Sequence, residues 1–145
     1  MNLHDCLLVA FYAAALLQIS VAGINMALVG LLNWQAALKQ MPLLMREVFH
    51  VHKWYISITL TIFGVLTLRF APMLANPELE IVIWLSIAIA VFWAIRAVIQ
   101  LCYYSSSHWK GRPGRTVIHV TLLLCYSGFA VLYALPSIVG SAPAA

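Results

Sequence analysis

Four long apolar runs constrain the fold of this chain more than any other feature: residues 6–32, 49–70, 81–104 and 116–135. A helix rises about 1.5 Å per residue, so about 20 residues are needed to cross a ~30 Å hydrocarbon core. The second run reaches that length only if it starts near Phe49. Backbone groups in lipid must find partners within the protein, which favours helices. The regularly alternating segments of a membrane barrel are absent from the sequence.

The composition agrees with a membrane location. Hydrophobic residues make up 64% of the chain and charged residues only 8%, whereas soluble domains carry roughly 25% charged residues. The N-terminal stretch MNLHDCLLVAFYAAALL lacks the basic residues of a signal peptide, so we expect it to be kept as a span. The sequence therefore predicts an all-α, polytopic membrane protein, in which a single domain over residues 1–145 forms a four-transmembrane-helix bundle.

The positions of the basic residues predict the orientation of the spans. In or beside the first and third connections lie Lys39, Arg46, Lys53, Lys110, Arg112 and Arg115. The second connection, RFAPMLANPELE, holds one arginine and two glutamates. Lys and Arg in short loops stay on the cytoplasmic side, which predicts both termini outside the cytoplasm of a bacterial inner membrane. The net charge of +4 thus has a topological explanation, and no nucleic-acid partner is expected.

The connections differ in their expected structure. The first, NWQAALKQMPLLMREVF, has apolar residues at roughly helical spacing and predicts a helix lying in the membrane interface, broken or started by Pro42. The second is expected to be a short turn. The third, YYSSSHWKGRPGR, is polar and rich in Gly and Pro, which predicts a loop. The tail over residues 136–145 has no ordering pattern and is expected to be flexible.

A rotation of 100° per residue sorts the polar residues of each predicted helix onto faces. The inward faces are expected to hold Phe11, Gln18, Ala22 and Asn25; Glu47, His50, Trp54, Ser57, Thr61 and Gly64; Trp93, Arg96, Gln100 and Tyr103; and His119, Leu123, Tyr126, Ala130 and Tyr133. Ser57, Thr61 and Gly64 are small residues that allow helices to approach closely. His52 falls nearly opposite His50, so the two cannot chelate one ion from a continuous helix.

Several polar residues are predicted at similar depth near the cytoplasmic side. If these faces converge, they line a candidate pocket of Asn25, Glu47, His50, Arg96, Gln100 and His119. Arg96 lies within an apolar span, where a charge costs about 2.5–3.5 kcal/mol and usually faces protein or water. Glu47 is the carboxylate on that side and is its expected partner if the arginine is buried. The alternative is that Arg96 reaches the headgroups, about 10 Å away by helical rise.

The histidines leave two further hypotheses open beside the simpler one, in which both are hydrated at the membrane boundary. Haem b needs two axial histidines on facing helices, and His50 and His119 have the required type and depth. A quinone, an anionic headgroup or the carboxylate of an anionic small molecule bound near Arg96 is also compatible with the residues, which select none of them. The single Glu47-x-x-His50 motif resembles half of a di-iron site, and a mononuclear metal site would need His119 as a third ligand. No nucleophile-and-base pair is evident in the sequence.

Two segments resemble a known group of proteins. FHVHKWYISITLTIFGVLTL and FWAIRAVIQLCYY are similar to parts of small uncharacterised four-span bacterial inner-membrane proteins. The resemblance implies the architecture and brings no activity with it. From the residues we expect a non-catalytic accessory or assembly subunit, surrounded by lipid and packed against a larger membrane complex or its own copies. Ile81, Trp84, Ile89 and Phe92 are the side chains expected to face partner helices.

Overall fold

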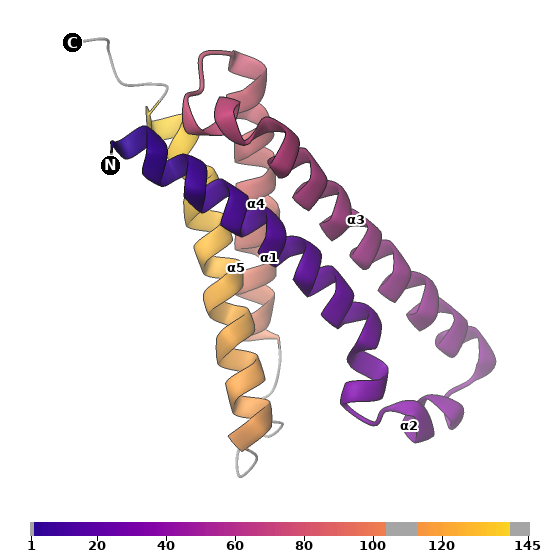
Figure 1. Cartoon of the computed structure of the whole chain (residues 1–145). Coiled ribbons are helices and arrows are strands. Elements are labelled where there is room, and N and C mark those ends of the chain that lie inside the picture. The colour runs from indigo at the N-terminus through magenta and orange to yellow at the C-terminus, as the bar shows by residue number, and fades with distance from the viewer. Residues whose placement is uncertain (1, 104–112, 140–145) are drawn as a thin grey trace. The chain divides into compact units, whose positions relative to one another are not determined.

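A computed structural model of the chain describes residues 2–103 and 113–139 (Figure 1). Its elements are the helices α1 (Leu3–Leu31), α2 (Gln35–Lys39), α3 (Leu43–Ala75), α4 (Glu80–Cys102) and α5 (Pro113–Val139). No strand occurs in this part of the chain, which confirms the predicted all-α fold class. Most of the third connection, residues 104–112, lies outside the described residues, and so does the end of the predicted tail, residues 140–145.

The predicted number of spans is also confirmed. The helices that are long and apolar enough to cross a membrane are Leu3–Leu31, Leu43–Ala75, Glu80–Cys102 and Thr116–Val139. The shortest of them has 23 residues and therefore a length of about 35 Å, which exceeds a ~30 Å hydrocarbon core. The chain thus has the helices of a multi-pass membrane protein. The side of the membrane on which its termini lie stays a prediction.

Three helix boundaries near a proline differ from those expected. The end of α3 is one of them, because the helix continues through Pro72 to Ala75, within the segment expected to form the short turn of the second connection. α3 begins at Leu43 rather than near Phe49, because the carbonyl of Pro42 accepts the first helical hydrogen bond, from the Arg46 amide at 3.1 Å. A proline tolerates this position since its fixed φ suits a helix start. α5 runs through Pro136 to Val139, where the flexible tail was expected to begin. Neighbouring groups often satisfy the backbone around a proline within a membrane helix.

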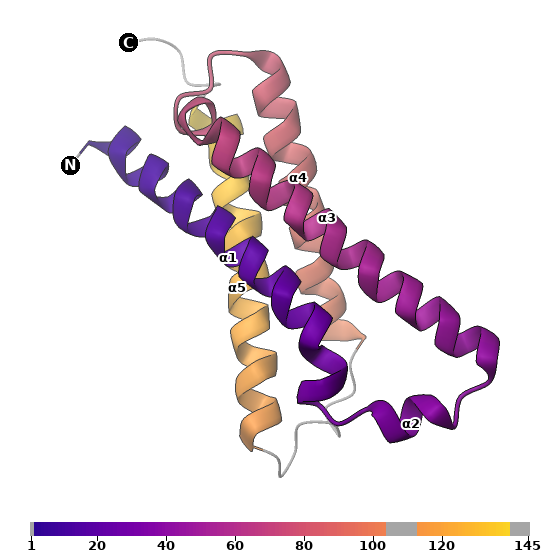
Figure 2. The same ribbon diagram turned by 45° about the vertical axis from the view of Figure 1, so that its right-hand side comes forward.

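The chain divides into two compact units, Val9–Ala71 and Met1–Leu8 with Pro72–Ala145. We describe these units separately, and the single domain over residues 1–145 stays a prediction. In the first unit, α1 and α3 form an antiparallel hairpin whose ends are connected through α2 (Figures 1 and 2). Asn25 of α1 meets Ser57 of α3, and Ile19, earlier in α1, meets Gly64, later in α3.

The turn that leaves α1 follows from its sequence. Asn33 has a φ of 54°, in the left-handed region that asparagine tolerates better than most residues. The Trp34 amide donates to the Val29 carbonyl at 3.0 Å, and the Asn33 amide donates to Gly30 at 3.1 Å. This pair of bonds is the Schellman motif, which satisfies the free carbonyls at a helix end. The helix expected in this connection is present as α2, although it is only five residues long.

In the second unit, α4 and α5 form another antiparallel hairpin. Ser86 donates a hydrogen bond to the carbonyl of Tyr133, Trp93 stacks on Tyr126, and Gln100 bonds His119. The partners advance along α4 as they retreat along α5. Most of the residues predicted to point inward on these two spans therefore do face each other. Tyr103, which was predicted with them, is exposed instead. The pairing thus brings the end of α4 to the same level as the start of α5.

Candidate functional site

The residues predicted to line one pocket belong to the two different hairpins. Asn25, Glu47 and His50 lie in the α1–α3 hairpin, while the α4–α5 hairpin holds Arg96, Gln100 and His119. The convergence of all six therefore stays a prediction, and so does an ion pair between Arg96 and Glu47. Within each hairpin, however, the structure gives these side chains specific partners.

Gln100 and His119 form a direct pair in the α4–α5 hairpin. The amide nitrogen of Gln100 lies 2.8 Å from Nδ1 of His119, and Gln100 is buried. An amide nitrogen can only donate, so Nδ1 accepts in this arrangement and the ring proton belongs on Nε2. Both residues were predicted on inward faces at similar depth. Their contact explains how a polar glutamine is accommodated within an apolar span.

Arg96 lies over an aromatic ring of its own hairpin. Its guanidinium carbon is 5.5 Å from the centre of the Tyr126 ring, and the arginine is half-buried. Such a contact contributes about 0.5–2 kcal/mol, depending on how far water is excluded. Tyr126 was predicted on the inward face of the last span, but its contact with Arg96 was not predicted. The contact could have been inferred from the sequence, because the antiparallel connection brings the two residues to the same level.

The ring beneath Arg96 belongs to a packed aromatic cluster. Trp93 is fully buried and stacks on Tyr126 with ring centres 5.3 Å apart. The Phe129 ring centre lies 4.7 Å from that of Trp93, and the Phe92 ring centre lies 5.4 Å from it. Aromatic pairs of this kind contribute about 0.5–1.5 kcal/mol beyond their burial. The cluster fills the interior of the α4–α5 hairpin and holds the Tyr126 ring in place below the guanidinium.

In the α1–α3 hairpin, Asn25 connects the two helices. Its amide nitrogen donates to Ser57 Oγ at 2.8 Å and to the Lys53 carbonyl at 3.2 Å. Lys53 of α3 also contacts α1, because its ammonium lies 3.4 Å from the carbonyl oxygen of Met26. These bonds join α1 to α3 by polar groups, as is common between membrane helices. Glu47 and His50 lie nearer the start of α3 with exposed side chains and take no part in these bonds.

Gly64 allows α1 and α3 to pack closely. A Cβ atom added there would lie 2.6 Å from Ile19 Cγ1 and 3.1 Å from the Ala15 carbonyl oxygen. Both distances are shorter than the ~3.5–4.0 Å at which carbon atoms normally make contact. The prediction that Gly64 serves close approach is therefore confirmed. Thr61, which was also predicted to serve close approach, lines a groove instead.

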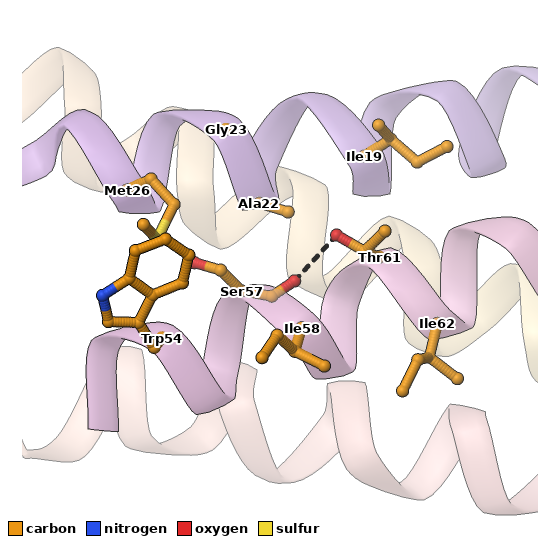
Figure 3. Close-up of a pocket in the computed structure, with 9 residues that line it drawn as sticks. All are labelled: Ile19, Ala22, Gly23, Met26, Trp54, Ser57, Ile58, Thr61 and Ile62. Atoms are coloured by element: carbon orange, nitrogen blue, oxygen red, sulfur yellow. Dashed lines mark hydrogen bonds between the residues drawn. The ribbon is translucent and has the colours of Figure 1, made fainter. Parts of the chain in front are cut away.

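A groove of about 420 Å³ runs along the α1–α3 hairpin (Figure 3). We call it the hairpin groove, and its lining residues are Ile19, Ala22, Gly23, Met26, Trp54, Ser57, Ile58, Thr61 and Ile62. Met26 and Trp54 lie at one end of it, and Ile19 and Ile62 toward the other. The sequence analysis placed several of these residues on inward faces but did not predict a groove, because helical rotation gives directions and not volumes.

The metal hypothesis gains no further ligand from the structure. Across residues 2–103 and 113–139, no three His, Cys, Asp or Glu side chains gather in a way that could hold a metal ion. The haem hypothesis depends on His50 and His119, which lie in different hairpins. It therefore stays a prediction, as does the quinone site.

Comparison with protein-family models, curated proteins and solved structures finds no match to this chain. The resemblance to small four-span inner-membrane proteins accordingly stays an expectation. The features that bear on function are the polar pairs within each hairpin and the surfaces that the hairpins leave uncovered.

Proposed function

We propose that this chain is a non-catalytic accessory or assembly subunit of a larger complex in a bacterial inner membrane, with both termini outside the cytoplasm. Four apolar helices support the membrane location. The observation that supports a partner is the uncovered side of α4. We call this side the α4 outer face, and its large members, each more than half exposed, are Ile81, Trp84, Val91, Ile95 and Val98.

The α4 outer face is separate from the side that packs against α5. Trp93 and Ser86 contact α5 residues, whereas the outer-face residues follow one another at intervals of three and four when Ala88, also exposed, is included. Such spacing over several turns is typical of a seam between two helices that wind around each other. Two of the residues expected to face a partner, Ile81 and Trp84, belong to it. Ile89 does not, because it is buried, and Phe92 is half-buried.

The composition of the α4 outer face also suits a partner helix. Lipid tails are as apolar as leucine, so membrane helices associate mainly through shape and polar bonds. Val91, Ile95 and Val98 are β-branched, which leaves their side chains with few rotamers to lose on packing. Ala88 gives the face a shallow point in its middle, where a neighbouring helix can come close. A regular row of stiff side chains around a small one favours a specific neighbour.

Co-purification of the full-length chain from native membranes in a mild detergent tests the proposal. We expect a larger membrane subunit to be recovered at a fixed ratio and to be lost from an Ala88→Leu variant. Ala94→Leu is the matched control, since Ala94 is also exposed on α4 but lies about 120° around the helix from Ala88. Recovery of the chain alone, or equal recovery of the partner with both variants, would overturn the proposal. Recovery of only a differently tagged copy would replace the complex by a homo-oligomer.

A further inference from the structure

We propose that the hairpin groove holds one acyl chain of an anionic phospholipid, with the phosphate of that lipid bound by the ammonium group of Lys53. This site lies on the α1–α3 hairpin and is independent of the α4 outer face. It therefore goes beyond the proposed subunit function, and the two can fail separately.

The length of the groove suits a hydrocarbon chain. From Trp54 to Ile62 the groove follows α3 for about 12 Å by helical rise. This is close to the ~15 Å depth of one leaflet, half of a ~30 Å core. An acyl chain that lies along the groove would therefore contact it over most of one leaflet.

The walls of the groove are apolar even where the residues are polar. Thr61 donates its hydroxyl to the Ser57 carbonyl at 2.9 Å (Figure 3). The Ser57 hydroxyl oxygen accepts from Asn25. These bonds engage the oxygen atoms within the hairpin. Ile58 and Ile62 supply apolar surface on the α3 side. A saturated chain, which offers no hydrogen bonds, is therefore a suitable occupant.

Gly23 keeps the α1 side of the groove open. An added Cβ atom at Gly23 would meet nothing within 4 Å, in contrast to Gly64, where the missing side chain allows helix packing. A longer side chain at Gly23 would therefore extend into the groove, which Gly23 lines.

A cation marks one end of the groove. The Lys53 ammonium lies 3.4 Å from the carbonyl of Met26, and both Met26 and the next residue, Trp54, line the groove. An ammonium group has three donors, so two remain after this bond. In the described parts of the chain, the recorded ion pair joins His4 and Asp5, and none involves Lys53. Lys53 is not one of the lining residues, but its ammonium lies beside the Met26 end of the groove, where an anion can reach it.

The surroundings of Lys53 strengthen the preference for an anionic headgroup. Arg46 lies seven residues earlier on α3 and hence on nearly the same side of the helix. Tryptophan residues favour the membrane interface, which places Trp54 at headgroup level and the rest of the groove within the leaflet. Basic pockets between membrane helices are known binding places for anionic headgroups. Charge complementarity thus selects an anionic phospholipid over a zwitterionic one.

Native mass spectrometry of the full-length chain tests this inference. The probes are phosphatidylglycerol and phosphatidylcholine with identical acyl chains, added to the detergent-solubilised protein. We expect one phosphatidylglycerol to be retained in preference. Gly23→Leu, which fills the groove, should weaken this binding at least tenfold, whereas Gly30→Leu should leave it unchanged. Gly30 is the matched control because it is also an exposed α1 glycine with nothing within 4 Å, yet it does not line the groove.

A second variant keeps the test decisive if Gly23→Leu does not fold. Lys53→Gln should reduce the preference for phosphatidylglycerol by about fivefold, the effect of one cation near an anionic surface. Equal binding of the two lipids by the wild-type chain would overturn the proposal. So would unchanged binding by Gly23→Leu with normal helical content. Competition by inorganic phosphate alone at the same concentration would show a headgroup site without chain recognition, which also contradicts it.

Discussion

Replacing Gly64 by alanine adds a methyl group where α1 packs against α3. The new carbon would lie 2.6 Å from Ile19 Cγ1, 3.3 Å from its Cδ1 and 3.1 Å from the Ala15 carbonyl oxygen. Ile19 or the helices must therefore shift by roughly 1 Å to restore contact at ~3.5–4.0 Å. Overpacking of this kind costs about 1–3 kcal/mol, while alanine gains roughly 0.5–1 kcal/mol as a helix former. We expect a net loss of about 0.5–2 kcal/mol in the free energy of unfolding.

Far-UV circular dichroism during an SDS titration of the detergent-solubilised chain measures this loss. Gly128→Ala is the control, because a Cβ atom at that α5 glycine would meet nothing within 4 Å. It should be neutral or stabilising. Ile19→Ala removes the atoms nearest to the new methyl group, so the double variant should recover about 1 kcal/mol relative to the sum of the single effects. The packing argument is refuted if Gly64→Ala is as stable as the wild type, or if the two substitutions are simply additive.

Further predictions concern the polar pairs and the orientation of the chain. Asn25→Ala should lower the free energy of unfolding by about 0.5–1.5 kcal/mol in the same titration, the range for hydrogen bonds between membrane helices. Tyr126→Leu should cost about 1–3 kcal/mol, because it removes both the stacked ring and the partner of Arg96. The purified chain should be colourless; a Soret absorbance band that disappears on replacing His50 or His119 by alanine would instead establish the haem alternative. Reporter fusions at the two chain ends should both be active outside the cytoplasm, and activity inside would invert the predicted topology.

The helices were predictable because each apolar run has a length that lipid imposes. The ends of the helices were less predictable, because a proline can either start a helix or lie within one. Pro42 starts α3, where its missing amide hydrogen is not needed, while Pro136 lies inside α5. The start near Phe49 was set by the length that the second apolar run needs to cross lipid, which does not determine where the helix itself begins. The end near residue 135 was set by the lack of an ordering pattern in the tail, which does not exclude a helix that continues through Pro136.

The polar pairs were predictable within a hairpin and not between hairpins. An antiparallel connection fixes depth, so Gln100 and His119 were expected at one level and are in contact. The order of helices in a bundle is not encoded by rotation about each helix axis, which is why a pocket of residues from both hairpins stays a prediction. The hairpin groove was missed for another reason. Gly23 and Gly64 look alike in sequence, yet one faces open space and the other faces Ile19.

Shape distinguishes the two surfaces to which we assign binding. Lipid surrounds both, so burial of apolar area gives little preference for one neighbour over another. The hairpin groove is apolar, extends for about 12 Å along α3 and has the Lys53 ammonium near one end, which suits a lipid molecule. The α4 outer face extends over most of a 23-residue helix and carries no charged side chain, because Arg96, the charged residue between Ile81 and Val98 in the sequence, lies over Tyr126 instead. A surface of that length without a headgroup ligand matches a helix that crosses both leaflets.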